Sequence, residues 1–166
     1  MSNLDYISAT VTCSKKLMPC SENNRKFDFK NPKQIPAKLY KVDGGLIASV
    51  GQKKCDYMYE VFSPNADIAQ ITKDLNQDNK ISPHIKKLVY VELKGKDFEQ
   101  GVSQLEVTAA TFKNRHSNCK SKHGFIVCSK VRHPQFSTLY QNLKAKFRKN
   151  HNISLTIQSQ VSNMTV

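Results

Sequence analysis

The sequence contains no apolar run that approaches the length needed to span a bilayer, and its N-terminus lacks the charged-then-apolar pattern of a secretory signal. These two absences predict a cytoplasmic protein with no membrane partner. Cysteines are few, and an odd number of five without regular spacing fits a reducing compartment better than a disulfide scaffold. A content of 39% hydrophobic and 23% charged residues also argues against a disordered chain.

Acidic residues are scarce as well. The chain has 13 Asp and Glu against 26 Lys and Arg, which gives a net charge of +13. Such an excess favours a polyanionic partner, and nucleic acid is the first candidate. The simpler alternative is a basic surface that only keeps the protein in solution. The charge therefore indicates a class of partner and leaves the chemistry open.

The length of 166 residues suits a single domain, residues 1–166, with its own hydrophobic core. Residues 1–36 carry the weakest patterns and form an N-terminal arm whose structure the sequence predicts poorly. A weak alternation over residues 6–12 resembles a strand, whereas residues 21–36 are polar and basic with two prolines and predict a loop or mobile arm. The core is expected at about residues 37–158.

Local patterns in this core predict strands and helices in alternation. Asp43-Gly44-Gly45 is a strong turn signal and predicts a hairpin between strands at 37–42 and 46–50. Apolar residues at helical spacing predict helices over 96–112 and from Pro134 onward. The remaining elements are expected as strands at 55–61, 88–94, 124–128 and 153–157, with a surface excursion at 63–85 that holds a short helix at 66–75. Together these elements predict an α/β fold, a mixed central sheet flanked by helices.

Charged residues lie at one end of two of these strands. Side chains alternate along a strand, so Glu92 and Lys94 point to the same side, and Asp56 and Glu60 share a side of the preceding strand. If the two strands pair, Asp56, Glu92 and Lys94 converge on one site. Two carboxylates can hold a divalent cation, and a lysine beside them can orient or activate a water molecule. The alternative is a structural ion pair at the sheet end, without a metal.

An acidic residue on one strand, Glu-x-Lys on the next and a helix after it resemble the core of the PD-(D/E)XK nuclease superfamily, the restriction-endonuclease-like phosphodiesterases. Asp56, the tripeptide Glu92-Leu93-Lys94 and Gln104 carry the resemblance, which covers about residues 38–158. It implies a restriction-endonuclease-like core. It also implies a metal-dependent phosphodiesterase that cuts nucleic acid, DNA in preference to RNA, and that can act as a homodimer.

The resemblance also implies a role for each residue. Asp56 and Glu92 would bind Mg²⁺ or Mn²⁺ together with the backbone carbonyl of Leu93. Lys94 would contact the attacking water or a phosphate oxygen, and Gln104 would support the site.

Two departures from the superfamily pattern leave an alternative open. RecB-like members have a tyrosine four residues after the glutamine, where this chain has Thr108. Many members also supply an acidic residue from a helix ahead of the Asp strand, but Glu22 and the few aspartates before Asp56 lie on no predicted helix. Glu60 could substitute in part. The alternative is a catalytically inactive nuclease-fold protein that binds nucleic acid or a partner protein.

Basic residues near these elements are candidates for contact with nucleic acid. They cluster before the Asp56 strand, in the loop after the first long helix, and ahead of the second, where helix N-terminal amides can add to phosphate binding. Solvated surface charge is the alternative for each of them. The candidates are Lys54, Arg115, Lys120, Lys122 and Arg132.

Overall fold

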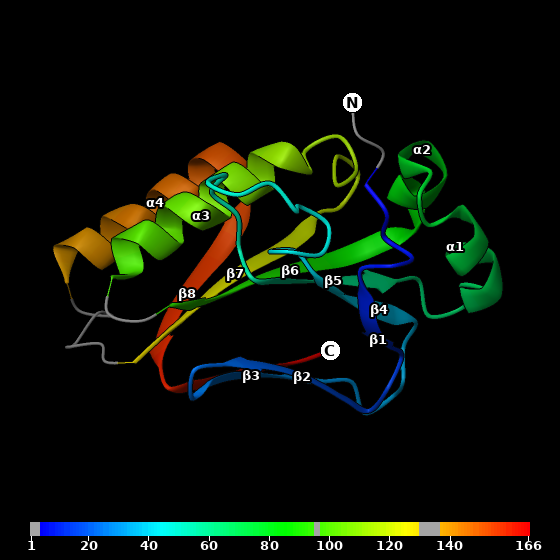
Figure 1. Cartoon of the computed structure of the whole chain (residues 1–166), viewed down its shortest axis with the longest axis horizontal. Helices are drawn as coiled ribbons and strands as arrows, with labels where there is room; N and C mark the ends of the chain where they lie inside the picture. Colours follow the sequence, from blue (N-terminus) through cyan, green and yellow to red (C-terminus); the bar gives the residue numbers. More distant parts are fainter. Residues whose placement is uncertain (1–3, 95–96, 130–136) are drawn as a thin grey trace.

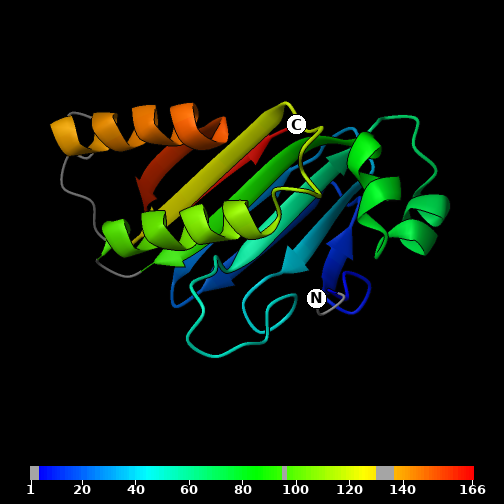
Figure 2. The same ribbon diagram turned by 90° about the horizontal axis from the view of Figure 1, so that it is seen from above.

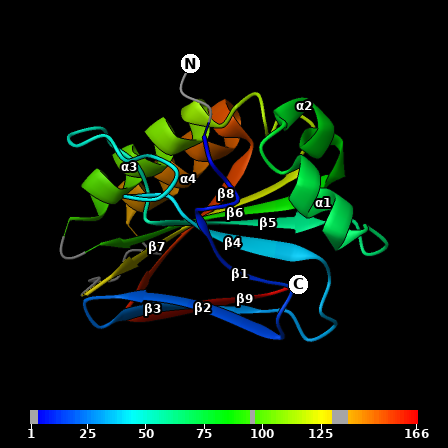
Figure 3. The ribbon, with the colours of Figure 1, turned by 45° about the vertical axis from the view of Figure 1, so that its right-hand side comes forward.

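The computed structural model describes residues 4–94, 97–129 and 137–166. These residues form three layers, with helices on one face of a central sheet and a smaller sheet on the other (Figures 1 and 3). The chain is thus an α/β protein, as expected. None of the helices in the described parts of the chain is long and apolar enough to cross a membrane.

The central sheet is mixed and has six strands. In spatial order these are β1 (Thr10–Cys13), β4 (Ala37–Lys41), β5 (Tyr57–Phe62), β6 (Ile85–Lys94), β7 (Ser121–Cys128) and β8 (Ile153–Ser159). The first four are antiparallel neighbours, whereas β6, β7 and β8 run parallel. The parallel strands are joined through α3 (Phe98–Thr111) and α4 (Thr138–His151), as parallel neighbours require a crossover.

The helices cover one face of this sheet. Figure 2 shows α3 and α4 over the sheet, with α1 (Ile68–Asp74) and α2 (Asp78–Ile81) at one end of its strands. The two long helices bury an apolar stripe on the sheet, with Val102 and Leu105 on α3 and Tyr140 and Phe147 on α4. The short helix α1 lies within the range predicted for the surface excursion. Pro134, where the second long helix was predicted to open, lies outside the described residues.

A three-stranded sheet covers the opposite face, and it corrects the expectation of a loop or mobile arm over residues 21–36. It consists of β2 (Leu17–Glu22), β3 (Arg25–Lys30) and β9 (Val161–Thr165), in the order β2-β3-β9. Phe27 and Phe29 on β3 are fully buried between the sheets. Alternate apolar residues therefore give this segment a buried face despite its many charges.

The predicted hairpin over 37–50 is also wrong in its second half. Strand β4 forms, but it pairs with β1 and β5, and residues 46–50 form only an isolated bridge between Asp43 and Ile47. Leu46 and Ile47 are buried as part of a loop that covers the helix-side core. The turn itself is as expected, and a Cβ at Gly45 would collide with the Lys41 carbonyl oxygen.

Candidate functional site

Asp56 and the Glu-x-Lys tripeptide meet where β5 begins and β6 ends. The antiparallel register sets Tyr57 opposite Val91, so Asp56, just before β5, lies beside the last residues of β6. Its backbone N–H donates to the Val91 carbonyl at 3.2 Å, and its side-chain Oδ2 accepts a hydrogen bond from the Leu93 N–H at 2.7 Å. Residues that are far apart in sequence are thereby fixed at one place.

Glu92 lies beneath the first turn of α3. Its side chain is only 2% exposed, and its Oε1 lies 3.9 Å from the Nζ of Lys94. Its Oε2 is buried and accepts no hydrogen bond from any described residue. The helix packs closely here, because a Cβ at Gly101 would lie 3.4 Å from the Glu92 Cγ. A glutamate oxygen is thus held inside the protein without a partner among residues 4–94, 97–129 and 137–166.

Burial dominates the electrostatics of this pair. It raises the pKa of Glu92, with a further rise from the charge of Asp56, to about 9, although Lys94 acts in the opposite direction. Burial also raises the pKa of Asp56, to about 6, against the lowering effect of the Leu93 N–H. Glu92 is therefore protonated at neutral pH unless a positive charge is added beside it. The arrangement is one that a cation would stabilise.

Gln104 and Thr108 on α3 hold the segment that leads into Asp56. The Gln104 Nε2 donates to the carbonyl oxygen of Lys54 at 3.1 Å, and the Thr108 Oγ1 accepts from the N–H of Cys55 at 2.8 Å. The Oε1 of Gln104 is buried without a partner in the described structure. Thr108, which departs from the RecB-like pattern, therefore shares a positioning role with Gln104.

Two further carboxylates, which sequence reasoning did not assign to the site, lie beside Asp56. Glu22 at the end of β2 and Asp43 in the turn after β4 line a surface hollow of about 390 Å³ together with Asp56. Lys41, Gly44 and Tyr57 complete its lining. The charges of Glu22 and Asp43 contribute to the raised pKa of both Asp56 and Glu92. The sequence does contain a turn signal next to Glu22. Asn23 and Asn24 both adopt positive φ, as tight hairpin turns require, and this turn places Glu22 at the end of its strand.

Glu60 lies on the same strand as the site but does not take part in it. It is fully buried, and its two oxygens accept hydrogen bonds from Nε and a terminal nitrogen of Arg115 at 2.6 and 2.9 Å. His116 Nε2 lies 2.8 Å from the same carboxylate. Burial alone would raise the pKa of Glu60, but Arg115 and His116 outweigh it and lower that pKa to about 2. The suggestion that Glu60 replaces the early acid is therefore wrong.

The basic candidates divide into enclosed and accessible residues. The prediction that Arg115 contacts nucleic acid is corrected by its burial. Arg115 is 1% exposed and binds Glu60, the Asp78 carboxylate and the Leu75 carbonyl, so its guanidinium does not face solvent. Lys54 is also buried, with its Nζ on the Ser49 carbonyl and 3.4 Å from Asp43. Lys120 is exposed and Lys122 half-buried. Arg132 lies outside the described residues.

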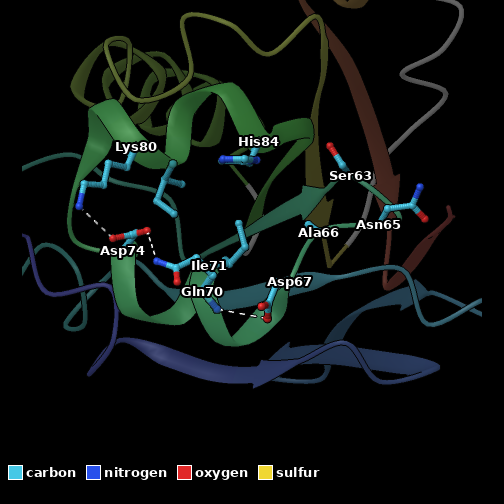
Figure 4. Close-up of a pocket in the computed structure, with 10 residues that line it drawn as sticks. Ser63, Asn65, Ala66, Asp67, Gln70, Ile71, Asp74, Lys80 and His84 are labelled. Atoms are coloured by element: carbon cyan, nitrogen blue, oxygen red, sulfur yellow. Dashed lines mark hydrogen bonds and ion pairs between the residues drawn. The ribbon is translucent and has the colours of Figure 1, made fainter.

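A separate hollow of about 310 Å³ lies between α1 and α2 (Figure 4). Its acidic groups are already engaged, because Asp74 binds Gln70 at 2.6 Å and Lys80 at 3.2 Å, and Asp67 caps α1. None of the predicted site residues lines it.

Within the described residues, no group of three or more His, Cys, Asp or Glu side chains is arranged to hold one metal ion. An ion between Asp56 and Glu92 would therefore have two side-chain carboxylates and complete its shell with other oxygen ligands. Comparisons of the chain with protein-family models, curated proteins and solved structures give no match.

Proposed function

We propose that this protein is a metal-dependent phosphodiesterase that cuts nucleic acid, DNA in preference to RNA, at Asp56, Glu92 and Lys94. The observation that carries the proposal is the buried Glu92, whose Oε2 has no partner in the described structure although a second carboxylate stands beside it. Burying one acid beside a second, half-buried acid is costly unless a cation is present in the working state. The net charge of +13 supports a polyanionic substrate.

The residues present fit Mg²⁺ or Mn²⁺. Magnesium binds hard oxygen ligands and needs only one or two carboxylates, because it keeps several of its waters. Asp56 would offer Oδ1, since Oδ2 is bound to the Leu93 N–H, and Glu92 would offer its unpartnered Oε2. The Leu93 carbonyl would be a third ligand. Apart from the short helices between β5 and β6, the order β4-β5-β6-α3-β7 supports the resemblance to the superfamily.

The chain's own residues would position the substrate and the water. When bound, the ion would stabilise negative charge on the scissile phosphate and lower the pKa of a coordinated water. Lys94, whose side chain is 24% exposed, reaches the edge of the site and would contact the water or a phosphate oxygen. Gln104 and Thr108 would keep Asp56 in place through the backbone of Lys54 and Cys55.

A cleavage assay tests this proposal. Supercoiled plasmid, DNA oligonucleotides and RNA oligonucleotides are incubated with the protein and Mg²⁺, Mn²⁺ or EDTA. We expect Glu92→Gln and Lys94→Ala to lose at least about a hundredfold in rate, the usual effect of removing an electrostatic stabiliser. Glu99→Gln, which removes an exposed carboxylate from the same helix turn that covers Glu92, is the matched control and should cut like the wild type.

Two results would overturn the proposal. Metal-dependent cutting that survives both substitutions would place the active site elsewhere. Salt-sensitive DNA binding without any metal-dependent cleavage would identify the inactive, binding-only alternative.

A further inference from the structure

A second, basic pocket lies at the opposite end of the helix layer from Glu92. It has a volume of about 280 Å³ and opens between the last residues of α3 and α4, above the starts of β7 and β8. This size is close to the lower limit of ordinary ligand pockets, about 300 Å³, and suits a small molecule rather than a polymer. Its lining consists of Tyr90, Ala109, Ala110, Lys113, His116, Lys122, Asn150, His151 and Ile153.

The lining carries cations and no carboxylate. Lys122 shares the helix-facing side of β7 with Gly124, whose missing Cβ faces Leu105 of α3. Its side chain is half-buried, and within the described ranges it forms no ion pair. Its ammonium group therefore brings a positive charge to the pocket without a carboxylate partner among the described residues. A bound anion would supply the missing charge.

Glu60 and Glu106 both lie close to lining residues, and each is paired with a cation outside the lining. Glu106 on α3 binds Lys146 of α4 at 3.0 Å and lies 4.0 Å from the Nε2 of His151. Glu106 therefore neutralises charge on α4, and Lys122 and Lys113 have no carboxylate partner in the part of the chain that the structure describes. The positive charge inside the pocket is uncompensated by the described residues.

Tyr90 and His116 form a hydrogen bond whose donor and acceptor can be assigned. Glu60 is ionised and can only accept, so the Nε2 of His116, 2.8 Å away, carries the hydrogen. Burial lowers the pKa of His116, which favours the neutral ring. Its Nδ1 then accepts the Tyr90 hydroxyl hydrogen at 2.8 Å. The Tyr90 oxygen is left as an acceptor beside a cationic pocket.

We propose that this pocket binds the phosphate group of a small phosphate-bearing ligand. Lys122 pairs with the phosphate charge, and the Tyr90 oxygen accepts a hydrogen bond from the P–OH group of the phosphate. Monohydrogen phosphate and a protonated phosphomonoester can donate such a hydrogen, whereas sulfate at neutral pH cannot. The inference is independent of the carboxylate site, because no residue of that site lines the pocket.

Isothermal titration calorimetry in EDTA tests it on the full chain. The probes are inorganic phosphate, sulfate, a nucleoside 5′-monophosphate and the matching nucleoside. We expect both phosphate probes to bind and Lys122→Gln to weaken them at least about tenfold, the loss of one charge-assisted hydrogen bond. Lys120→Gln makes the same charge change two residues away on the exposed surface and should change affinity less than about twofold.

The two phosphate probes also distinguish a nucleotide ligand from free phosphate. Tighter binding of the nucleoside monophosphate than of inorganic phosphate identifies a nucleotide ligand, and equal binding identifies phosphate alone. No binding of either phosphate probe overturns the proposal. Equal losses in the Lys122 and Lys120 variants overturn it too, as does sulfate binding as tight as phosphate. Glu92→Gln should bind phosphate as the wild type does. Failure of the cleavage proposal would therefore leave the phosphate proposal untouched.

Discussion

Two buried glutamates of this protein show that the partner decides how a carboxyl group behaves. Glu60 and Glu92 lie on neighbouring strands, and burial acts to raise the pKa of both. Arg115 and His116 reverse the effect at Glu60, whose pKa falls to about 2. Glu92 faces another carboxylate, and its pKa rises to about 9. The first arrangement is complete within the protein, whereas at Glu92 the partly exposed Lys94, 3.9 Å away, does not offset burial and the neighbouring carboxylate.

The raised pKa of Glu92 predicts a stability that falls with pH. Above the ordinary pKa of 4.5 the unfolded chain loses the Glu92 proton, while the folded chain keeps it up to a pKa of about 9. The folded state then binds more protons, so its stability decreases over this window by about 1.4 kcal/mol per pH unit and levels off above it. Glu92→Gln should remove this decrease of stability with pH. Urea unfolding of wild type and variant from pH 5 to 9, without metal, measures the difference.

Glu99→Gln is the control for this titration and should keep the wild-type pH dependence. Parallel pH curves for wild type and Glu92→Gln would contradict a buried, protonated Glu92.

Metal binding at the same pair should depend on pH in the opposite direction. The ion displaces the Glu92 proton, and that displacement becomes easier as pH approaches the pKa of about 9. Mn²⁺ should therefore raise the melting temperature of the wild type more at pH 8 than at pH 6, and should have no such effect on Glu92→Gln. Differential scanning calorimetry with Mn²⁺ or EDTA measures both. An equal shift in the variant would mean that the ion binds elsewhere.

Arg115→Met should destabilise the fold strongly. The substitution keeps much of the side-chain volume but leaves Glu60 as a buried charge without its main partner. The expected loss is about 3–5 kcal/mol, the range found when one member of a buried ion pair is removed. Chemical unfolding at pH 7 measures it. Lys113→Met, on the exposed surface nearby, is the control, and similar losses in the two variants would argue against the buried pair.

At the scale of elements, the three-stranded sheet gives the central sheet a second buried face. Phe29 of β3 stacks on Tyr59 of β5 with ring centroids 4.5 Å apart, and the Tyr59 hydroxyl donates to the Met18 carbonyl of β2 at 2.8 Å. These contacts join the two sheets. The smaller sheet is thus part of the core rather than an appendage.

Phe29→Ala should therefore cost about 3–5 kcal/mol of unfolding free energy, the range for a buried aromatic side chain. Leu17→Ala on β2 is the comparison, because Leu17 is 48% exposed and should change stability little. Guanidinium unfolding followed by circular dichroism measures both variants. Equal effects would mean that the smaller sheet does not pack as described.

Strong local patterns explain which elements the sequence predicted. Strand β6 is a continuous apolar run and α3 has an apolar stripe, so both were found, and alternation along the strands placed Asp56 beside Glu92 and Lys94. Strand β3 was missed because Arg25, Lys26, Asp28 and Lys30 mask its buried phenylalanines. Its partner β9 lies far along the chain, and no local pattern predicts a pairing between such distant strands. Arg115 was misplaced for the same reason, since only tertiary contacts with Glu60 reveal its burial.

At the scale of the whole molecule, the net charge of +13 predicts salt-sensitive binding to nucleic acid. A protein that neutralises roughly six phosphates loses about a thousandfold in affinity between about 50 and 200 mM salt. Fluorescence anisotropy with labelled DNA and RNA duplexes over this range measures the slope. Glu99→Gln should leave the slope unchanged, and an affinity independent of salt would argue against a polyanionic partner.

The parallel pairing of β3 with β9 has a consequence for synthesis. Strand β9 leaves the ribosome long after β2 and β3, and a two-stranded hairpin alone is marginally stable at best. Glu22, at the end of β2, is therefore held beside Asp56 only once residue 165 has emerged. A nascent chain that lacks β9 does not carry the finished hollow, so the carboxylates assemble only after β9 has been synthesised.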